Sequence, residues 1–413
     1  MKSIRKIVLI LSMFAFVCSS FCFFDLINAT SELPIQVAIF NGSGALPSCV
    51  SRTESTIQAY VNNNPGVTIN TKRIDHIDNI DDLSGVDILI MPGGTHGYTY
   101  LDNTNNNAVR EFVKLGHGYI GICAGAYAGA NQVDDRYKSY GVAPHINCIA
   151  AYHEGLTKLT MTSEGNRILG MPNSEYVMDH ENGPVMYSNS VGAVSLATYN
   201  GIEGIGHSGS IAIAFDEYYN GKTILFGPHP ESDDPNYPSM LGNAIKFIAS
   251  KGSTNLSVDM PNTISVNQTM KMVVNLSNEF GIGLNDKNIN INLSYLNDSD
   301  FNTSDLIMEN YNLENISYDG RTNSDGLIPF NLTLNSTGVY EFSAWFPGDE
   351  GHDSSNIYSK KLNVTDNQIN NKGIYSIYND ISDNKFDSGL GECGFPLIIL
   401  FISMIVVLVC WKK

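Results

Sequence analysis

The sequence predicts an α/β domain followed by an all-β domain, and three observations carry this prediction. First, short apolar runs alternate with segments of helical periodicity from Ile35 to about residue 250, which is typical of a mainly parallel sheet with helices on both faces. Second, apolar and polar residues alternate from Ser253 onward, where Asn, Ser and Thr dominate. Third, apolar segments at both ends of the 413-residue chain indicate targeting and membrane segments.

The first domain is expected over residues 33–250, and its elements alternate along the chain. Strands are predicted at Ile35–Phe40, Val67–Ile74, Val86–Met91, the stretch ending in Gly118-Tyr119-Ile120, and Lys222–Phe226, and the first and the last two of them are expected to be buried. Helices are predicted at Ser51–Val61, with Ser48 or Ser51 as its cap, at Asn107–Leu115 and at Ser239–Ala249. Between Val142 and Phe215, short runs alternate with loops rich in Gly, Asn and Pro, which predicts antiparallel strands added at the sheet edge.

The second domain is expected over residues 253–366 as an all-β sandwich of immunoglobulin-like size. Alternating apolar positions such as Met272 and Val274 are separated by turn signals such as Asp325-Gly326. Its sequence lacks the Cys–Trp–Cys core of antibody domains. Asn-x-Ser/Thr sequons are dense here, and a glycosylated exterior would suit them. Residues 367–394 are polar and irregular, which predicts a linker.

The two ends of the chain carry membrane signals. Three basic residues precede the apolar run Ile7–Phe24, so residues 1–29 are expected to be a signal peptide or an uncleaved signal anchor. Residues 395–411 are apolar and are followed by Lys412-Lys413, which predicts a transmembrane helix with its C-terminus inside. We therefore expect a single-pass protein of the cell membrane with both domains outside the cell.

The net charge of the chain limits the classes of partner that it is expected to bind. The chain has 42 acidic and 24 basic residues and no basic stripe. This excess of negative charge argues against nucleic acid or an anionic lipid surface as a partner. Contact with the membrane is expected through the C-terminal helix, and the sequence does not indicate an oligomeric state.

Cysteine and histidine spacing predicts neither a metal site nor a cofactor. Of the seven cysteines, Cys49, Cys123, Cys148 and Cys393 lie in the predicted exterior. A Cys49–Cys148 disulfide is one possible pairing outside the cell, and it would leave Cys123 free. The sequence contains no Cys-x-x-Cys, His-x-x-x-His or Glu-x-x-His pair, so a zinc site is not expected.

The stretch Gly121-Ile122-Cys123-Ala124-Gly125 lies between a predicted strand and residues suited to a helix. A Gly-x-Cys-x-Gly sequence in this place is the thiol form of a nucleophile elbow, in which the glycines permit a strained turn. The N-terminus of the following helix favours the thiolate form of Cys123. The alternative interpretation is a Gly-rich turn with a buried structural cysteine.

Two further motifs supply the other parts of a catalytic site. His229, in Pro228-His229-Pro230, follows a buried strand and is a candidate base, and Glu231 is close enough in sequence to orient its imidazole. Backbone N–H groups of Gly93, Gly94 and Ala124 are candidate oxyanion donors. Each motif alone is also compatible with a loop histidine, a surface Glu or a plain turn. A weaker expectation places His96, Tyr98 and Tyr127 in contact with substrate.

These residues carry a family resemblance. Pro92-Gly93-Gly94, the cysteine motif and Gly227-Pro228-His229-Pro230-Glu231 resemble motifs of the class I glutamine amidotransferase-like superfamily. Gly116–Tyr127 and Asn182-Gly183-Pro184 are more specifically similar to the family named after the N-terminal domain of biotin–protein ligase. Over about Ile35 to Ser250, the resemblance implies a flavodoxin-like three-layer α/β/α fold and a Cys123–His229–Glu231 triad.

The resemblance implies no substrate, and no ligase domain follows that would justify biotin transfer. The second domain is similar to immunoglobulin-like domains of archaeal and bacterial surface proteins. An extracellular location favours hydrolysis over ammonia transfer that depends on ATP. The sequence also has no P-loop motif for binding ATP. We therefore expect a cysteine-dependent hydrolase acting on a small amide or peptide substrate. The alternative is a catalytically idle, adhesin-like protein that binds a surface ligand.

Overall fold

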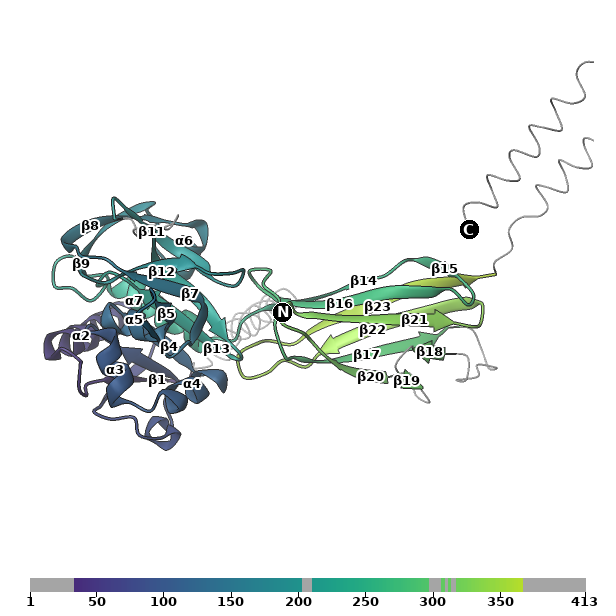
Figure 1. Cartoon of the computed structure of the whole chain (residues 1–413), viewed down its shortest axis with the longest axis horizontal. Coiled ribbons are helices and arrows are strands. Elements are labelled where there is room, and N and C mark those ends of the chain that lie inside the picture. Colours follow the sequence, from purple (N-terminus) through teal and green to yellow (C-terminus); the bar gives the residue numbers. More distant parts are fainter. Residues whose placement is uncertain (1–32, 203–209, 297–305, 309–310, 313–316, 367–413) are drawn as a thin grey trace, which may run out of the picture. The chain divides into compact units, whose positions relative to one another are not determined.

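The computed structural model describes residues 33–202, 210–296, 306–308, 311–312 and 317–366 (Figure 1). They form a mixed α/β structure that is rich in strands and contains six α-helices within these ranges. The predicted signal peptide 1–29, linker 367–394 and membrane helix 395–411 lie outside the described residues. Among the residues that are described, no helix is both long and apolar enough to cross a membrane.

Residues 33–250, called the head below, alternate between strands and helices. Its elements are β1 Ile35–Phe40, α2 Pro47–Asn63, β2 Ile69–Ile74, the 3-10 helix η1 Ile80–Leu83, β3 Ile88–Met91, α3 Gly97–Asn103, α4 Asn106–Lys114, β4 Gly118–Ile122, α5 Ala124–Gly129, β5 Ala130–Val133, β6 Tyr137–Lys138, β7 Ala143–Ala150, β8 Glu154–Met161, α6 Ser163–Leu169, β9 Glu175–Glu181, β10 Pro184–Ser188, β11 Val194–Asn200, β12 Ile211–Tyr218, β13 Gly221–Phe226 and α7 Pro238–Ala249.

The strands of the head form one mixed sheet. Its main path is β2-β1-β3-β4-β13-β12-β10-β7-β5-β6, and β8, β9 and β11 branch from β12. The five strands from β2 to β13 are parallel, while β12, β10, β7 and β11 join by antiparallel pairs. The predicted antiparallel additions are therefore present, but they are so extensive that the sheet as a whole is mixed rather than mainly parallel.

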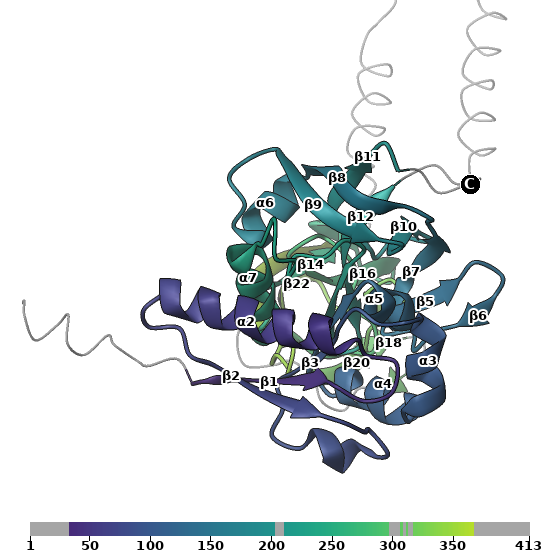
Figure 2. The ribbon, with the colours of Figure 1, turned by 90° about the vertical axis from the view of Figure 1, so that its left-hand side faces the viewer.

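Helices cover both faces of the parallel strands, as predicted. Successive residues of β1 point to opposite faces, so Ile39 belongs to one apolar core and Phe40 to the other. Helices α2, α6 and α7 contribute to the first core, and α3, α4 and α5 contribute to the second. Figure 2 shows α2 lying beside α7 and along the strands it covers. Burial of Val50 and Ile57 on α2 stabilises the fold by about 1.5–3 kcal/mol per side chain.

Two helices differ from the sequence prediction. Helix α2 begins at Pro47, with Leu46 rather than Ser48 or Ser51 as its N-cap. Proline suits the first helical position because its fixed φ matches the helix and the missing N–H would have no partner there. The earlier start places Cys49 in the first turn of α2. Helix α3 was not predicted, and it follows directly on the Pro92-Gly93-Gly94 loop.

Residues 253–366, called the β region below, contain two five-stranded sheets. Their strands are β14 Thr254–Asp259, β15 Thr263–Ser265, β16 Thr269–Asn278, β17 Asn288–Tyr295, β18 Leu306–Met308, β19 Tyr311–Asn312, β20 Ser317–Arg321, β21 Leu327–Leu334, β22 Gly338–Phe346 and β23 Ser355–Thr365. The sheets have the orders β14-β16-β21-β18-β19 and β15-β23-β22-β17-β20. Met272 of the first sheet and Phe342 of the second belong to one shared apolar core, so the predicted all-β region is confirmed.

The glycines around β4 are required by close packing. An ideal Cβ on Gly125, in α5, would lie 1.9 Å from the carbonyl oxygen of Met91 at the end of β3. An ideal Cβ on Gly121 would lie 2.4 Å from the carbonyl oxygen of Gly125. Both obstacles are backbone atoms, which cannot rotate away as a flexible side chain could. Glycine at these positions therefore lets α5 approach β3 and β4 closely.

We predict that Gly125→Ala lowers the free energy of unfolding of the head by about 3 kcal/mol, because the new methyl group must displace the backbone of β3. Chemical denaturation followed by circular dichroism measures this change. Gly252→Ala is the matched control, since the nearest atom that the new Cβ would meet belongs to the Lys222 side chain, at 3.5 Å. Equal stabilities of the two variants would contradict this account of the packing.

Candidate active site

The three predicted motifs follow three neighbouring parallel strands. Strand β4 pairs with β3 on one side and with β13 on the other. The register aligns Met91 with Gly121 and Ile122 with Phe226, so the three strands end at nearly the same level. The loops that follow them therefore begin at one edge of the sheet, which is where ligand sites form in parallel sheets.

Cys123 lies in a strained turn between β4 and α5. Its backbone has φ 51° and ψ −105°, a conformation that residues other than glycine rarely adopt. The N–H of Cys123 donates to the carbonyl oxygen of Phe226 at 2.8 Å, and its own carbonyl accepts from the N–H groups of Ala126 and Tyr127. These bonds join the turn to β13 and to α5. Cys123 thus lies in a tight strand-to-helix turn, and the residue is 7% exposed.

His229 and Glu231 form a buried hydrogen-bonded pair. Nδ1 of His229 lies 2.9 Å from Oε1 of Glu231, and the two residues are 7% and 1% exposed. The N–H of His229 donates to the carbonyl oxygen of Asp179 at 2.9 Å, which fixes the loop against β9. The pairing leaves Nε2 as the ring nitrogen available to another group.

The surroundings of His229 favour its charged form. Burial alone would lower the pKa of the imidazole, but the charge of Glu231 opposes it, as do interactions with the Cys123 side chain. The pKa of His229 is consequently held well above its usual value. Cys123 and His229 stand on the loops that follow the paired residues Ile122 and Phe226, so the thiol lies on the loop next to that of the ring. Nε2 of His229 has no well-aligned hydrogen-bond partner in the described part of the chain.

The predicted oxyanion donors lie in two segments, the loop after β3 and the start of α5. Gly93 is buried and touches His229, because a Cβ built on it would lie 2.8 Å from Cε1 of the ring. Gly94 pairs with Ala45 through an isolated β-bridge. Ala124, directly after the thiol, is the first residue of α5. The Tyr100 hydroxyl, which the sequence prediction missed, donates to the carbonyl oxygen of Pro92 at 2.9 Å and holds the glycine loop.

The segment from Glu181 to Pro184 also borders the site. Sγ of Cys123 donates to the carbonyl oxygen of Glu181 at 3.5 Å. Asn182 has φ 54°, and a Cβ on Gly183 would lie 1.9 Å from the carbonyl oxygen of Gly227, so this segment passes tightly over the loop that carries His229. The sequence singled out residues 182–184 but assigned no contact to Glu181, because a backbone carbonyl leaves no signal in the sequence.

The three residues expected to contact substrate lie in two different places in the head. The Tyr127 hydroxyl donates to the carbonyl oxygen of Asn182 at 3.1 Å. Burial raises the pKa of the Tyr127 hydroxyl. His96 and Tyr98 stack on each other, with ring centroids 4.9 Å apart, and Tyr98 is 46% exposed. Tyr98 also meets the Tyr137 ring edge-on, with ring centroids 6.1 Å apart.

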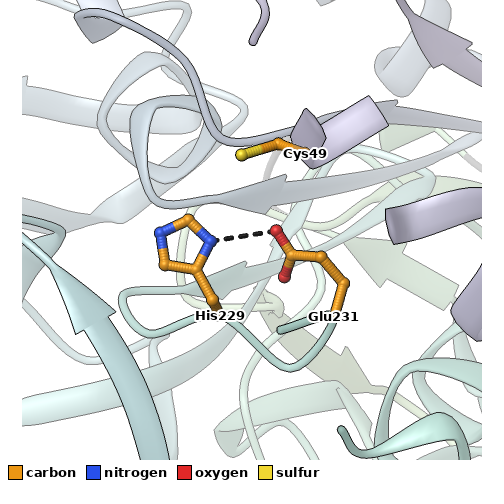
Figure 3. A group of neighbouring side chains, drawn as sticks. All are labelled: Cys49, His229 and Glu231. Carbon is orange, nitrogen blue, oxygen red and sulfur yellow. Dashed lines mark hydrogen bonds and ion pairs between the residues drawn. The ribbon is translucent and has the colours of Figure 1, made fainter. Parts of the chain in front are cut away.

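Cys49 is the site residue that sequence reasoning missed. Its sulfur, a nitrogen of His229 and a carboxylate oxygen of Glu231 all lie within 4.8 Å of one another (Figure 3). Burial raises the pKa of the Cys49 thiol to about 11, with the charge of Glu231 adding to the effect. Cys49 lies in the first turn of α2, shortly after the loop that follows β1. Its position after the carboxyl end of a parallel strand was the one sign in the sequence that it could lie at the same sheet edge.

The suggested Cys49–Cys148 disulfide is absent, since both cysteines are free thiols. They belong to different parts of the head. Cys148 on β7 lies in the second apolar core and donates weakly to the carbonyl oxygen of Ala126. Cys49 lies beside His229 instead. The pairing was suggested from cysteine number, and number carries no information on which faces of the sheet the thiols occupy.

Comparison with known proteins identifies one domain-level similarity. Residues 35–142 match the family model described as "Biotin-protein ligase, N terminal". A biotin–protein ligase from Schizosaccharomyces pombe is 32% identical over 107 residues, which are 25% of this chain and 16% of the ligase. The chain thus spans about one sixth of that relative's length.

Solved structures add weaker matches. The CARDB domain of a protein from Pyrococcus furiosus matches with 12% identity and a TM-score of 0.18, over 28% of this chain and 96% of that one. A superoxide reductase from Ignicoccus hospitalis matches with 12% identity and a TM-score of 0.17, over 27% and 80%. These scores are too low to support a shared fold. Over residues 35–142, the chain is similar to the N-terminal domain of biotin–protein ligases.

Proposed function

We propose that the head is a cysteine-dependent hydrolase of carbon–nitrogen bonds in small amides or peptides. The observation that carries the proposal is the hydrogen-bonded His229–Glu231 pair next to a thiol in an elbow turn. A nucleophile, a base and a group that orients the base are the parts required for nucleophilic acyl transfer. Further support comes from the backbone N–H groups of Gly94, in the loop after β3, and of Ala124, the first residue of α5.

The proposed reaction begins with attack of the Cys123 thiolate on the substrate carbonyl carbon. In the reactive pair the thiol's proton is already held on Nε2 of His229, whose charged form the site favours, and Glu231 keeps the ring oriented through Nδ1. The negative oxygen of the tetrahedral intermediate accepts hydrogen bonds from the N–H groups of Gly94 and Ala124. His229 then protonates the leaving nitrogen, and the C–N bond breaks. Finally water, deprotonated by His229, attacks the thioester and releases the acid.

The wider architecture is part of the same proposal. The alternation of helices over both faces of five parallel strands supports a flavodoxin-like head of the class I glutamine amidotransferase-like superfamily. The two sheets with a common core support an immunoglobulin-like stalk. The apolar segments near the chain ends support an extracellular place and a membrane anchor at 395–411. Outside the cell, ATP is scarce, and hydrolysis is then better supported than ammonia transfer.

A second candidate function is a catalytically idle head that binds a surface ligand, as in an adhesin. The burial of the site favours it, because Cys123 and His229 are each only 7% exposed. Sγ of Cys123 is also engaged by the carbonyl oxygen of Glu181. A buried, hydrogen-bonded thiol is the arrangement expected of a structural cysteine.

Alkylation rates separate the two candidates. We expect iodoacetamide near neutral pH to modify Cys123 at least about tenfold faster than Cys148, because burial raises the pKa of the Cys148 thiol well above its usual value, while Cys123 lies at the sheet edge on the loop next to that of His229. Peptide mapping by mass spectrometry after timed quenching measures both rates on the same molecules. Equal, slow modification of the two cysteines would favour the idle binding protein.

We expect Cys123→Ala to reduce hydrolysis of γ-glutamyl and peptide amides by at least about 10³-fold, because no other group of the triad can form the thioester. Release of amine from each substrate measures the rate. Cys148→Ala is the matched control, since it removes a buried thiol of the same head away from the site. Equal turnover by wild type and Cys123→Ala would rule out the mechanism.

The pKa of His229 predicts a pH-dependent effect of Glu231→Gln on stability. Because the pKa is raised in the folded state, protonated His229 stabilises the fold fully below its unfolded value of about 6.5, and this contribution is lost as pH rises through the raised value. Loss of the Glu231 charge should therefore destabilise the protein by about 3–5 kcal/mol between about pH 5 and 6.5, and by less at higher pH.

Urea unfolding at several pH values tests this prediction. Glu181→Gln is the control, because it removes one carboxylate from an exposed position next to the site and leaves the backbone carbonyl in place. Its effect should be small and independent of pH over the same range. A destabilisation by Glu231→Gln that increases with pH would show that the pair is not held in its charged form.

A further inference from the structure

The proposed mechanism leaves one chemically active side chain without a role. Cys49 is 6% exposed and lies against the catalytic pair. The ligand-type atoms of Cys49, His229 and Glu231 lie within 4.8 Å of one another. Figure 3 shows the Cys49 sulfur directed at the His229 ring, and the Glu231 carboxylate hydrogen-bonded to Nδ1 of the same ring. The three residues therefore form a compact cluster of one thiol, one imidazole and one carboxylate.

This donor set fits a thiophilic divalent ion. Zn²⁺ binds cysteine sulfur at about 2.3 Å, histidine nitrogen at about 2.0–2.1 Å and carboxylate oxygen at about 2.0–2.2 Å. In a tetrahedral site these bond lengths place the ligand atoms about 3.3–3.6 Å apart. Atoms that already lie within 4.8 Å of one another would have to move by about 1 Å or less. Small rotations of buried side chains provide shifts of this size.

A second observation also points to a ligand. Oε2 of Glu231 is buried and has no hydrogen-bond partner among the residues that the structure describes. A buried polar atom without a partner is unfavourable. Because this oxygen is already removed from water, an ion that binds here does not have to strip solvent from it. The Glu231 side chain is only 1% exposed.

We propose that Cys49, His229 and Glu231 bind a divalent transition-metal ion, with Zn²⁺ the best fit, and that the bound ion blocks the catalytic triad. Cys49 would lose its thiol proton on binding, and the His229–Glu231 pair would release the proton that it shares. His229 could then no longer accept a proton from Cys123. The fourth position is left for water or for the Cys123 sulfur. The inhibition of the triad by the bound ion rests on the proposed hydrolase function. The binding of the ion itself does not.

The sequence could not predict this site. Cys49 is separated from His229 by most of the head, so no motif spacing joins the two residues. The expectation that no metal is bound came from the lack of closely spaced ligand pairs. Such pairs are typical of sites built on one helix or one turn. Here the ligands come from the start of α2 and from the loop after β13.

Cobalt binding to the full chain tests the proposal directly. Co²⁺ takes the place of Zn²⁺ and gives a sulfur-to-metal absorption band when a thiolate is bound. We expect the wild type to show this band and Zn²⁺ to abolish it by displacing Co²⁺. Cys49→Ser should weaken Co²⁺ binding by more than about 100-fold, since a direct ligand matters more than the outer-shell partners that change affinity about 10–100-fold. The matched control Cys148→Ser should bind as the wild type does.

The other variants decide between ligand sets. Binding that survives Cys49→Ser unchanged, or a wild type without the band, would overturn the proposal. A band that disappears in Cys123→Ala but persists in Cys49→Ser would also overturn it, because the ion would then sit on the catalytic thiol. The absorption experiment needs no turnover, so it stands even if Cys123→Ala shows that the head is not a hydrolase. If the head is active, Zn²⁺ should inhibit the wild type and leave Cys49→Ser at least about tenfold less sensitive.

Discussion

The candidate site depends on the pairing of β4 with β13. This pairing brings the two halves of the proposed triad together, because Cys123 follows one strand and His229 follows the other. The N–H of Cys123 continues the ladder by donating to the carbonyl oxygen of Phe226, so the strained turn is fixed by the same strand that leads to the imidazole. A residue held in so unfavourable a backbone conformation requires such support from its surroundings.

The buried pair His229–Glu231 imposes a second constraint. A carboxylate and an imidazolium removed from water are favourable only when they are close and well aligned, and their Nδ1–Oε1 distance of 2.9 Å satisfies this condition. The backbone bond from His229 to Asp179 and the close passage of Gly183 over Gly227 hold the loop in the required position. Part of the extra antiparallel sheet therefore serves the site, since Asp179 lies on β9, which is reached through β8 and β11.

The parts of the site that follow strands could be predicted from the sequence. Cys123 and the Pro92-Gly93-Gly94 loop come directly after buried apolar runs, and such runs identify strands that end at a common edge. The sequence did not reveal Cys49, because its position depends on where α2 begins and on a helix cap without a side-chain bond. The sequence also gave no indication that the backbone carbonyl of Glu181 contacts the Cys123 thiol, since every residue has such a carbonyl whatever its side chain.

Two thiols share one imidazole in this site, and their backbones distinguish them. Cys49 lies in the first turn of a regular helix, and burial together with the charge of Glu231 raises the pKa of its thiol to about 11. Such a thiol is a poor nucleophile at neutral pH, although a metal ion can still displace its proton. Cys123 lies in the strained turn on the loop next to that of His229. The two proposals therefore give the sulfurs different chemistry, attack for Cys123 and metal binding for Cys49, and both proposals use His229.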